Sequence, residues 1–223
     1  QSWKDIFPKK GEIHFAGALE NNEDTGTLQY LASTAMEAGF STRVLDMQAL
    51  DLQNGRFFDP AGELVNRCFK LYPWEWMVDE SPDGCLAEME WLEPIWKLVM
   101  SNKAILATLY ELFPDSPYVL PCYLSRPRSG LFCKKPVFSR EGHNVSVVDI
   151  RDWEEYVRIA ETEGDYNTGA YVYQEYVEPT AYSGRYPVIG SWIIGGEAAG
   201  IGIRENRMEV TDNLSEFVPH IIG

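Results

Sequence analysis

A lysine pair followed by a charged loop is the part of the sequence best suited to bind phosphate. Lys134 and Lys135 end an apolar, strand-like run, and Arg140 and Gly142 lie in the loop that follows. Because neighbouring side chains of a strand point to opposite faces, one ammonium of the pair is expected to face inward and to need an anionic partner. Loop N–H groups and the planar fork of Arg140 suit phosphate oxygens. The Walker spacing is absent, so an ordinary hairpin with a solvated charged turn is the alternative.

An acidic pair, Glu23 and Asp24, lies between a predicted strand at 13–16 and a predicted helix. The helix pattern consists of apolar residues at helical spacing, namely Leu28, Leu31, Ala32, Ala35 and Met36. Gly39 ends the helix and a second strand follows at 42–46, which predicts a βαβ unit. The loop after the first strand of such a unit lies at the edge where ligands bind. The alternative role of the pair is favourable charge at the helix N-terminus, with Asp24 near the cap.

The middle of the chain offers a turn, an aromatic stretch and a helical pattern. Asn54-Gly55 between apolar runs predicts a hairpin. Residues 68–77 combine tyrosine, proline and two tryptophans, which suggests a strand end that turns into an aromatic-lined pocket, with core packing as the alternative. Residues 86–112 have helical spacing, and Pro94 favours two helices over one. Lys103 is then expected near the start of the second helix, where a solvated lysine is the ordinary case.

The last part of the chain has the alternation of antiparallel strands. Strands are expected around 145–148 and 171–177, with a short helix or exposed turn at 151–157 between them. Two further strands flank Gly195-Gly196, a two-residue hairpin signal. Because this pattern differs from that of the first half, we expect a boundary near residue 100 and two regions, 1–100 and 101–223.

Composition excludes several classes of protein and partner. The chain has 223 residues with 45% hydrophobic and 24% charged residues, which is typical of a globular protein with one or two domains. The net charge of −15 argues against nucleic acid or an anionic membrane as the main partner and leaves small molecules as the expected ones. The four cysteines lack CxxC spacing and are expected to be buried thiols. Since neither a signal peptide nor an apolar run of membrane-spanning length is evident, we expect a cytoplasmic protein.

Several motifs occur together in one order, and this order resembles the glutathionylspermidine synthase family. More narrowly, the chain is similar to the stand-alone synthetase-like members, which are ATP-grasp acid–amine ligases. The resemblance covers nearly the whole chain and rests on seven motifs at 22–27, 70–77, 102–104, 135–145, 161–166, 174–176 and 200–220.

The resemblance implies a mixed fold, α+β or α/β, of ATP-grasp type. A βαβ layer like the pre-ATP-grasp domain is expected on the substrate side in 1–100, and a mostly antiparallel nucleotide-binding sheet is expected in 101–223. The implied reaction is ATP-dependent amide formation between a carboxylate of a glutathione-like peptide or acid and a polyamine-like amine. It would pass through an acyl phosphate and use Mg²⁺.

Residue roles follow from the same resemblance. Lys103 and one lysine of the pair Lys134 and Lys135 look like the lysines that bind the ATP phosphates. Gly142 and its neighbours look like the flexible loop that closes over the triphosphate. The hinge that holds adenine and ribose is expected at four consecutive residues, Gln174, Glu175, Tyr176 and Val177.

On the substrate side, Glu23 and Asp24 look like the acidic pair that faces the amine and peptide substrates. Ser139 departs from the family pattern, because the family usually has glycine there, and we expect a stiffer loop. The family's Arg-x-Asp and Glu-x-Asn residues, which bind Mg²⁺ and the acyl phosphate, are expected upstream of residue 1. No catalytic residue or metal ligand is therefore assigned within the chain, and we expect the chain alone to bind ATP weakly without turnover.

Two other readings stay open on the sequence. One is a homologue that binds a nucleotide or peptide without catalysis, as the Ser139 departure would allow. The other is an acidic interaction module that binds no nucleotide. Stabilisation by Mg-ATP separates the nucleotide-binding readings from the interaction module.

Overall fold

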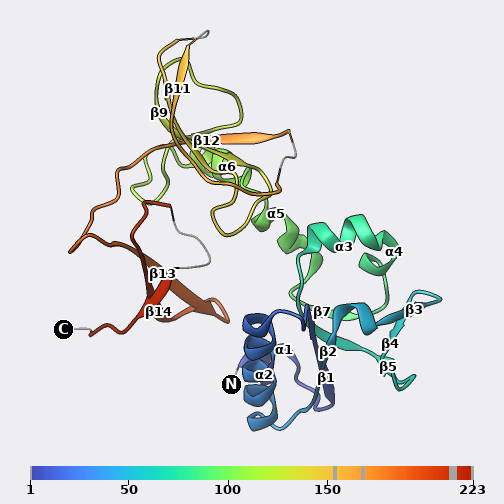
Figure 1. Cartoon of the computed structure of the whole chain (residues 1–223). Helices are drawn as coiled ribbons and strands as arrows, with labels where there is room; N and C mark the ends of the chain where they lie inside the picture. The colour runs from blue at the N-terminus through green and yellow to red at the C-terminus, as the bar shows by residue number, and fades with distance from the viewer. Residues whose placement is uncertain (1, 153–154, 167–168, 211–214, 222–223) are drawn as a thin grey trace. The chain divides into compact units, whose positions relative to one another are not determined.

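The computed structural model describes residues 2–152, 155–166, 169–210 and 215–221 (Figure 1). The chain divides into two compact units, Gln1–Val99 and Met100–Gly223. The division lies next to residue 100, where the strand pattern of the sequence changes. The substrate and nucleotide roles of the two regions stay predictions. Among the described residues, no helix is long and apolar enough to cross a membrane.

The first unit combines one parallel sheet, a small antiparallel sheet and several helices. Its elements in chain order are α1 (Ser2–Ile6), β1 (Glu12–Gly17), α2 (Asn22–Glu37), β2 (Ser41–Asp46), a 3₁₀ turn (Met47–Ala49), β3 (Asp51–Gln53), β4 (Arg56–Phe58), β5 (Leu64–Val65), β6 (Arg67–Leu71), α3 (Trp74–Glu80), α4 (Pro82–Cys85), β7 (Glu90–Leu92) and a second 3₁₀ turn (Ile95–Lys97). The parallel sheet has the order β2-β1-β6-β7, and β3-β4-β5 form the small sheet.

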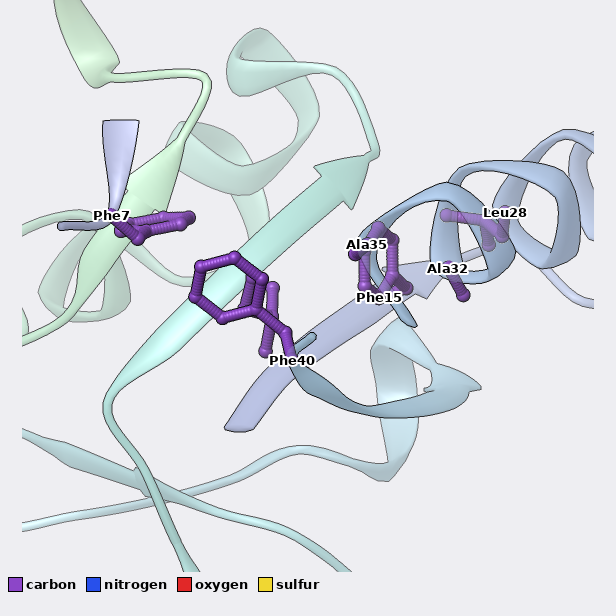
Figure 2. Packing of buried hydrophobic residues seen from close by; sticks show 7 residues of the cluster. Phe7, Phe15, Leu28, Ala32, Ala35 and Phe40 are labelled. Carbon is purple, nitrogen blue, oxygen red and sulfur yellow. The ribbon is translucent and has the colours of Figure 1, made fainter. Parts of the chain in front are cut away.

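The βαβ unit predicted from the sequence is confirmed. β1 pairs in parallel with β2, and α2 connects them. Ile13 and Phe15 of β1 are fully buried in one cluster with Leu28 and Ala35 of α2. Figure 2 shows Phe15 of this cluster with Leu28 and Ala35. Because a strand alternates its side chains, His14 and Ala16 face the other side of the sheet, where Ala16 packs in a second cluster. Both faces of β1 are therefore covered, as is usual for a parallel strand.

Asn21 caps the N-terminus of α2 with its side chain, and Gly39 ends the helix with a positive φ. Asn21 is the N-cap: its Oδ1 accepts hydrogen bonds from the backbone N–H of Glu23 at 2.9 Å and of Asp24 at 3.5 Å. Gly39 ends the helix with a φ of +94°, and its N–H donates to the Met36 carbonyl at 2.8 Å. The cap is therefore Asn21, and the two acids lie in the first turn, where carboxylates stabilise the helix dipole.

The buried histidine of β1 is the main titratable group of the first unit's interior. His14 is 2% exposed, and its Nε2 lies 3.7 Å from Glu12 Oε2 and 4.0 Å from Asp59 Oδ2. Arg43 bridges the same two carboxylates. Burial lowers the pKa of His14 below its ordinary value of 6.5, and the two carboxylates only partly oppose this. The imidazole is therefore expected to be neutral at pH 7.

The helical prediction for 86–112 is wrong in its first half. Glu90–Leu92 form β7, which pairs in parallel with β6, and regular helix begins only with α5 at Leu98. Trp91 contacts the rings of Phe57 and Trp74 edge-on, at centroid distances of 5.5 and 5.7 Å. Pairing with an open sheet edge and burial of this ring outweigh a helical spacing that local sequence alone suggested.

The aromatic stretch becomes a strand followed by a helix. Trp74 begins α3 and is buried, and its ring lies 3.8 Å from the Lys70 ammonium. Trp76 is 39% exposed and contacts the Tyr72 ring edge-on. The two tryptophans therefore have different surroundings, and Trp74 follows the core-packing alternative rather than the predicted pocket.

The second unit is mostly antiparallel sheet, as predicted. With α5 (Leu98–Ser101) at the boundary, its elements are α6 (Ile105–Leu112), β8 (Cys122–Tyr123), β9 (Gly130–Pro136), β10 (Ser146–Ile150), β11 (Tyr156–Glu161), β12 (Tyr171–Glu175), β13 (Tyr186–Ile194), β14 (Glu197–Asn206) and β15 (Glu216–Val218). One sheet has the order β11-β10-β9-β12-β8 and the other β13-β14-β15. All pairs in both sheets are antiparallel. Of the predicted short helix or exposed turn at 151–157, residues 153–154 lie outside the described residues. The Arg151 N–H donates to the Glu155 carbonyl at 3.1 Å, and residues 156–157 belong to β11 rather than to a helix or turn.

Both hairpin signals are confirmed. Asn54 and Gly55 have φ of +50° and +76° and join β3 to β4. Gly195 and Gly196 have φ of +62° and +85° and join β13 to β14. Positive φ at both central residues is the signature of the type I′ turn, whose twist matches that of the flanking strands.

Candidate functional site

Lys134 and Lys135 of β9 point to opposite faces of the sheet, and the structure shows what each face offers. The Lys134 ammonium lies 4.0 Å from the centroid of the Tyr171 ring. The Lys135 ammonium donates a hydrogen bond to Gln174 Oε1 at 2.7 Å. Both side chains are half-buried. The two lysines thus have different partners, and only one of them can serve a given ligand.

Lys103 reaches the same face as Lys135 from the turn before α6. Its backbone N–H donates to the Val137 carbonyl at 2.8 Å, which fixes it beside the end of β9. Its ammonium donates to the carbonyl of Ser139 at 2.5 Å and to Ser139 Oγ at 2.9 Å. Lys103 therefore lies near the start of a helix, as predicted, and contacts the loop that follows β9.

One cavity brings these groups together. It has a volume of about 310 Å³ and is lined by Lys103, Cys133, Lys135, Ser139, Arg140, Glu141, Gly142, Val145, Glu209 and Val210. Three cations line it against two acids, in a chain whose net charge is −15. A local excess of positive charge in an acidic chain fits an anionic ligand. Lys134 is absent from this lining and instead lines a smaller cavity with Arg126 and Tyr173.

The loop at the rim of the cavity contains a tight turn. The His143 N–H donates to the Arg140 carbonyl at 2.9 Å. The two residues between them, Glu141 and Gly142, have φ of +56° and +73°. Successive backbone N–H groups in a turn can form a concavity that binds anions, and Glu141 adopts a conformation that side chains usually avoid. The predicted loop at Gly142 is therefore a built turn at the edge of the cavity.

None of the four residues predicted to form the hinge is among the residues that line this cavity, but they lie differently relative to it. Gln174 contacts Lys135 through its side chain, so it lies on the cavity face of β12. Glu175 and Val177 are exposed, and neither lines the cavity as the structure describes it. Tyr176 lies between these extremes, because its hydroxyl donates to Glu209 Oε2 at 2.8 Å.

Glu209 is the cavity residue that the sequence did not reveal. Burial, together with the hydrogen bond to Glu209, raises the pKa of Tyr176 to about 12, so the phenol stays a donor at neutral pH. This contact links the end of β12 to the segment after β14. No spacing rule connects residues 176 and 209, since the link depends on how the chain folds back.

Burial raises the pKa of Cys133, which also lines the cavity, although the nearby Lys135 charge opposes the shift. Its thiol is therefore expected to stay protonated at neutral pH. A protonated thiol is a poor nucleophile and a poor metal ligand. We therefore expect Cys133 to line the cavity without reacting.

Across 2–152, 155–166, 169–210 and 215–221, no group of three histidine, cysteine, aspartate or glutamate side chains is placed to hold a metal ion. Glu209 and Glu141 line the cavity, but Glu209 accepts a hydrogen bond from Tyr176. Magnesium usually takes one or two carboxylates in addition to phosphate oxygens and water.

The acidic pair belongs to the first unit, whereas the lysine cavity belongs to the second. Glu23 is exposed and Asp24 is half-buried in the first turn of α2. They follow the carboxyl end of β1, where Gly17 packs so tightly that a Cβ would lie 2.9 Å from Leu28 Cδ1. Their place at the carboxyl edge of a parallel sheet fits the prediction of a ligand site.

Comparison with protein families identifies the chain. The family model described as glutathionylspermidine synthase preATP-grasp matches residues 1–223. The chain belongs to the glutathionylspermidine synthase family. The resemblance drawn from the seven motifs is thereby confirmed.

Individual members of the glutathionylspermidine synthase family are similar to this chain over most of its length. A protein of Haemophilus influenzae named as an acid–amine ligase is 34% identical over 95% of this chain and 56% of its own. The trypanothione synthetase of Crithidia fasciculata is 28% identical over 93% of this chain and 35% of its own. The bifunctional glutathionylspermidine synthetase/amidase of Escherichia coli is 26% identical over 90% and 36%. The chain thus spans about half or less of the length of these relatives.

A solved structure shows a similar fold. The crystal structure of D-cycloserine synthetase has a TM-score of 0.52 to this chain at 14% sequence identity, over 87% of this chain and 68% of the other. At this identity the likeness concerns the fold alone. It supports the mixed α/β architecture with several sheets.

Proposed function

We propose that the chain supplies the nucleotide-binding part and the amine-side part of an ATP-dependent acid–amine ligase of ATP-grasp type. The observation that carries this proposal is the convergence of Lys103, Lys135 and the Arg140–His143 turn on one cavity of about 310 Å³. Membership of the glutathionylspermidine synthase family and relatives named as synthetases and a ligase support it.

The lysines would act by position and charge. An ammonium has three donors, so Lys135 can keep its bond to Gln174 and still offer two donors to phosphate oxygens. Lys103 can do the same once its contacts with Ser139 are exchanged. In phosphoryl transfer the protein acts mainly by positioning the reactants and neutralising their negative charge.

The proposed reaction has two balanced steps. A carboxylate oxygen of the acid attacks the γ-phosphorus of ATP, and the bond to ADP breaks, which gives an acyl phosphate and ADP. The amine nitrogen then attacks the acyl carbon, inorganic phosphate leaves with the electron pair of the broken C–O bond, and the nitrogen loses a proton. Cationic donors stabilise both steps, because negative charge builds up on the transferred and leaving phosphate oxygens.

The amine side of the proposal rests on Glu23 and Asp24. Two carboxylates in one helical turn suit a substrate with several ammonium groups, such as a polyamine, and the acid is proposed to be a glutathione-like peptide. ATP and Mg²⁺ are the proposed cofactors, with the magnesium ligands not assigned to this chain. Cytoplasm is the proposed location, because ATP and reduced thiol peptides occur there.

Two measurements test this function in sequence. Mg-ATP should raise the melting temperature of the chain and give a measurable dissociation constant by calorimetry, whereas Mg-GTP or ATP-free magnesium serves as the control. Mass spectrometry then examines a form of the protein that includes the family's Arg-x-Asp and Glu-x-Asn residues. It is mixed with ATP, polyamines and thiol peptides, and products are sought at masses reduced by one water relative to the summed substrates. Absence of ATP binding at millimolar concentration would contradict the nucleotide site.

A homologue that binds ATP without catalysis is the second candidate, and one contact favours it. The Ser139 hydroxyl accepts a hydrogen bond from Lys103, which glycine could not offer, and so competes with phosphate for this ammonium. Under this alternative, a form of the protein that includes the family's Arg-x-Asp and Glu-x-Asn residues binds ATP but releases no ADP with any amine and peptide. Ser139→Ala removes the competing hydroxyl and should strengthen ATP binding under either candidate. The gain should be only about a few-fold, because the backbone carbonyl at 139 still accepts a hydrogen bond from Lys103.

A further inference from the structure

The loop at the rim of the nucleotide cavity is held differently at its two ends. On the amino-terminal side, the Lys103 ammonium contacts Ser139 through the carbonyl and the hydroxyl. On the carboxyl-terminal side, the partners come from the segment 162–166, which follows β11. The first set of contacts uses a cation that a phosphate can attract away, whereas the second set uses neutral hydrogen bonds.

Thr162 makes the tightest of the carboxyl-terminal contacts. Its hydroxyl lies 2.5 Å from the Gly142 carbonyl, to which it donates, and accepts from the Val145 N–H at 2.9 Å. Its backbone N–H donates to the Val145 carbonyl at 2.9 Å. The half-buried Thr162 side chain therefore binds both Gly142, in the turn, and Val145, which directly precedes β10.

Asn144 adds a second connection between the same segments. Its Nδ2 donates to the Gly164 carbonyl at 2.9 Å, and its Oδ1 accepts from the Tyr166 N–H at 2.8 Å. Gly164 packs so closely that a Cβ there would lie 2.5 Å from His143 Cβ. The contact between the two loops therefore depends on a glycine at 164 and on both ends of the Asn144 amide.

We propose that Thr162 and Asn144 are positioning residues of the nucleotide site, which fix the carboxyl-terminal half of the 139–145 loop so that only its amino-terminal half closes on the triphosphate. This inference rests on the proposed function for its ligand. Closure at the amino-terminal half requires Lys103 to exchange Ser139 for a phosphate, and the left-handed pair Glu141 and Gly142 is the pivot between the two halves. Because the carboxyl-terminal half is already ordered before ATP binds, the loop loses less conformational entropy on binding.

The test compares Thr162→Val, which keeps the shape and loses the hydroxyl, with Thr162→Ser, which keeps the hydroxyl. Thr162→Val should weaken Mg-ATP binding about tenfold, as expected for one or two lost hydrogen bonds, and Thr162→Ser should stay within about twofold of the wild type. Adenosine should bind all three proteins equally, because it lacks the triphosphate. A merely structural role would lower both affinities together.

A second readout needs no nucleotide. Amide hydrogen exchange of the ligand-free chain should show faster exchange at Val145 and Tyr166 in Thr162→Val and in Asn144→Gly, but not in Thr162→Ser. Glycine suits residue 144, because Asn144 has a φ of +54°. If the wild type fails to bind ATP, the proposed function fails while exchange still tests the loop. Wild-type exchange and wild-type ATP affinity in Thr162→Val would overturn the inference.

Discussion

The neighbouring lysines of β9 provide the sharpest test of the proposed nucleotide site, because they lie side by side on one strand and point to opposite faces of the sheet. Lys135→Met removes an ammonium that lines the cavity with Lys103, and Lys134→Met removes one that lies over the Tyr171 ring. Methionine keeps an unbranched apolar stem of similar length. Both side chains are half-buried on the same strand, so general effects on the sheet should be similar.

The expected magnitude follows from the donors that Lys135 has left. One N–H binds Gln174 at 2.7 Å, and two others can reach phosphate oxygens. A hydrogen bond between charged partners contributes about 1.5–3 kcal/mol, which corresponds to a loss of roughly 10- to 150-fold in affinity for Mg-ATP. Lys134→Met should change this affinity by less than about threefold, since its charge acts through the sheet and through solvent.

The assay is calorimetric titration of wild type and both variants with Mg-ATP and with adenosine, at low salt and at physiological salt. Lys135→Met should lose ATP affinity and keep adenosine affinity, because only the triphosphate contacts the ammonium. The difference between the variants should shrink as salt rises, since ions screen the charge. A loss in Lys134→Met as large as that in Lys135→Met would refute the assignment of the phosphate face.

Three further predictions concern the first unit. Asn21→Ala should lower its free energy of unfolding by about 1 kcal/mol, measured by urea denaturation, because it removes the α2 cap, whereas Asn22→Ala should change it little. Because burial lowers the pKa of His14, only the unfolded state takes up its proton just below pH 6.5. The free energy of unfolding should therefore fall as pH drops below 6.5, by at most about 1.4 kcal/mol per pH unit. His14→Gln should remove this pH dependence from the urea midpoints. Glu23→Gln combined with Asp24→Asn should weaken binding of a polyamine about tenfold in calorimetry and leave Mg-ATP binding unchanged, and equal polyamine binding would contradict the proposed amine site.

Local sequence patterns predict those helices, strands and turns whose conformation depends on residues close by in the sequence. The strand at 13–16, the helix that Gly39 ends and the two glycine hairpins all formed where the sequence placed them. Each depends on side-chain periodicity or on a positive φ, which act over a few residues. The helical spacing at 90–92 does not predict its strand, because this strand is stabilised by pairing with β6, about twenty residues earlier in the chain.

For the candidate site, the sequence alone determined which residues carry suitable charges and that the adjacent lysines must face opposite ways. Only the tertiary structure decided that Lys135, not Lys134, shares a cavity with Lys103, because the identity of a strand's faces depends on what packs against them. It also added Glu209, Thr162 and the Lys103–Ser139 contact, which join residues far apart in the chain. Alternation is a local property of the backbone, whereas the partner of each face is set by the fold.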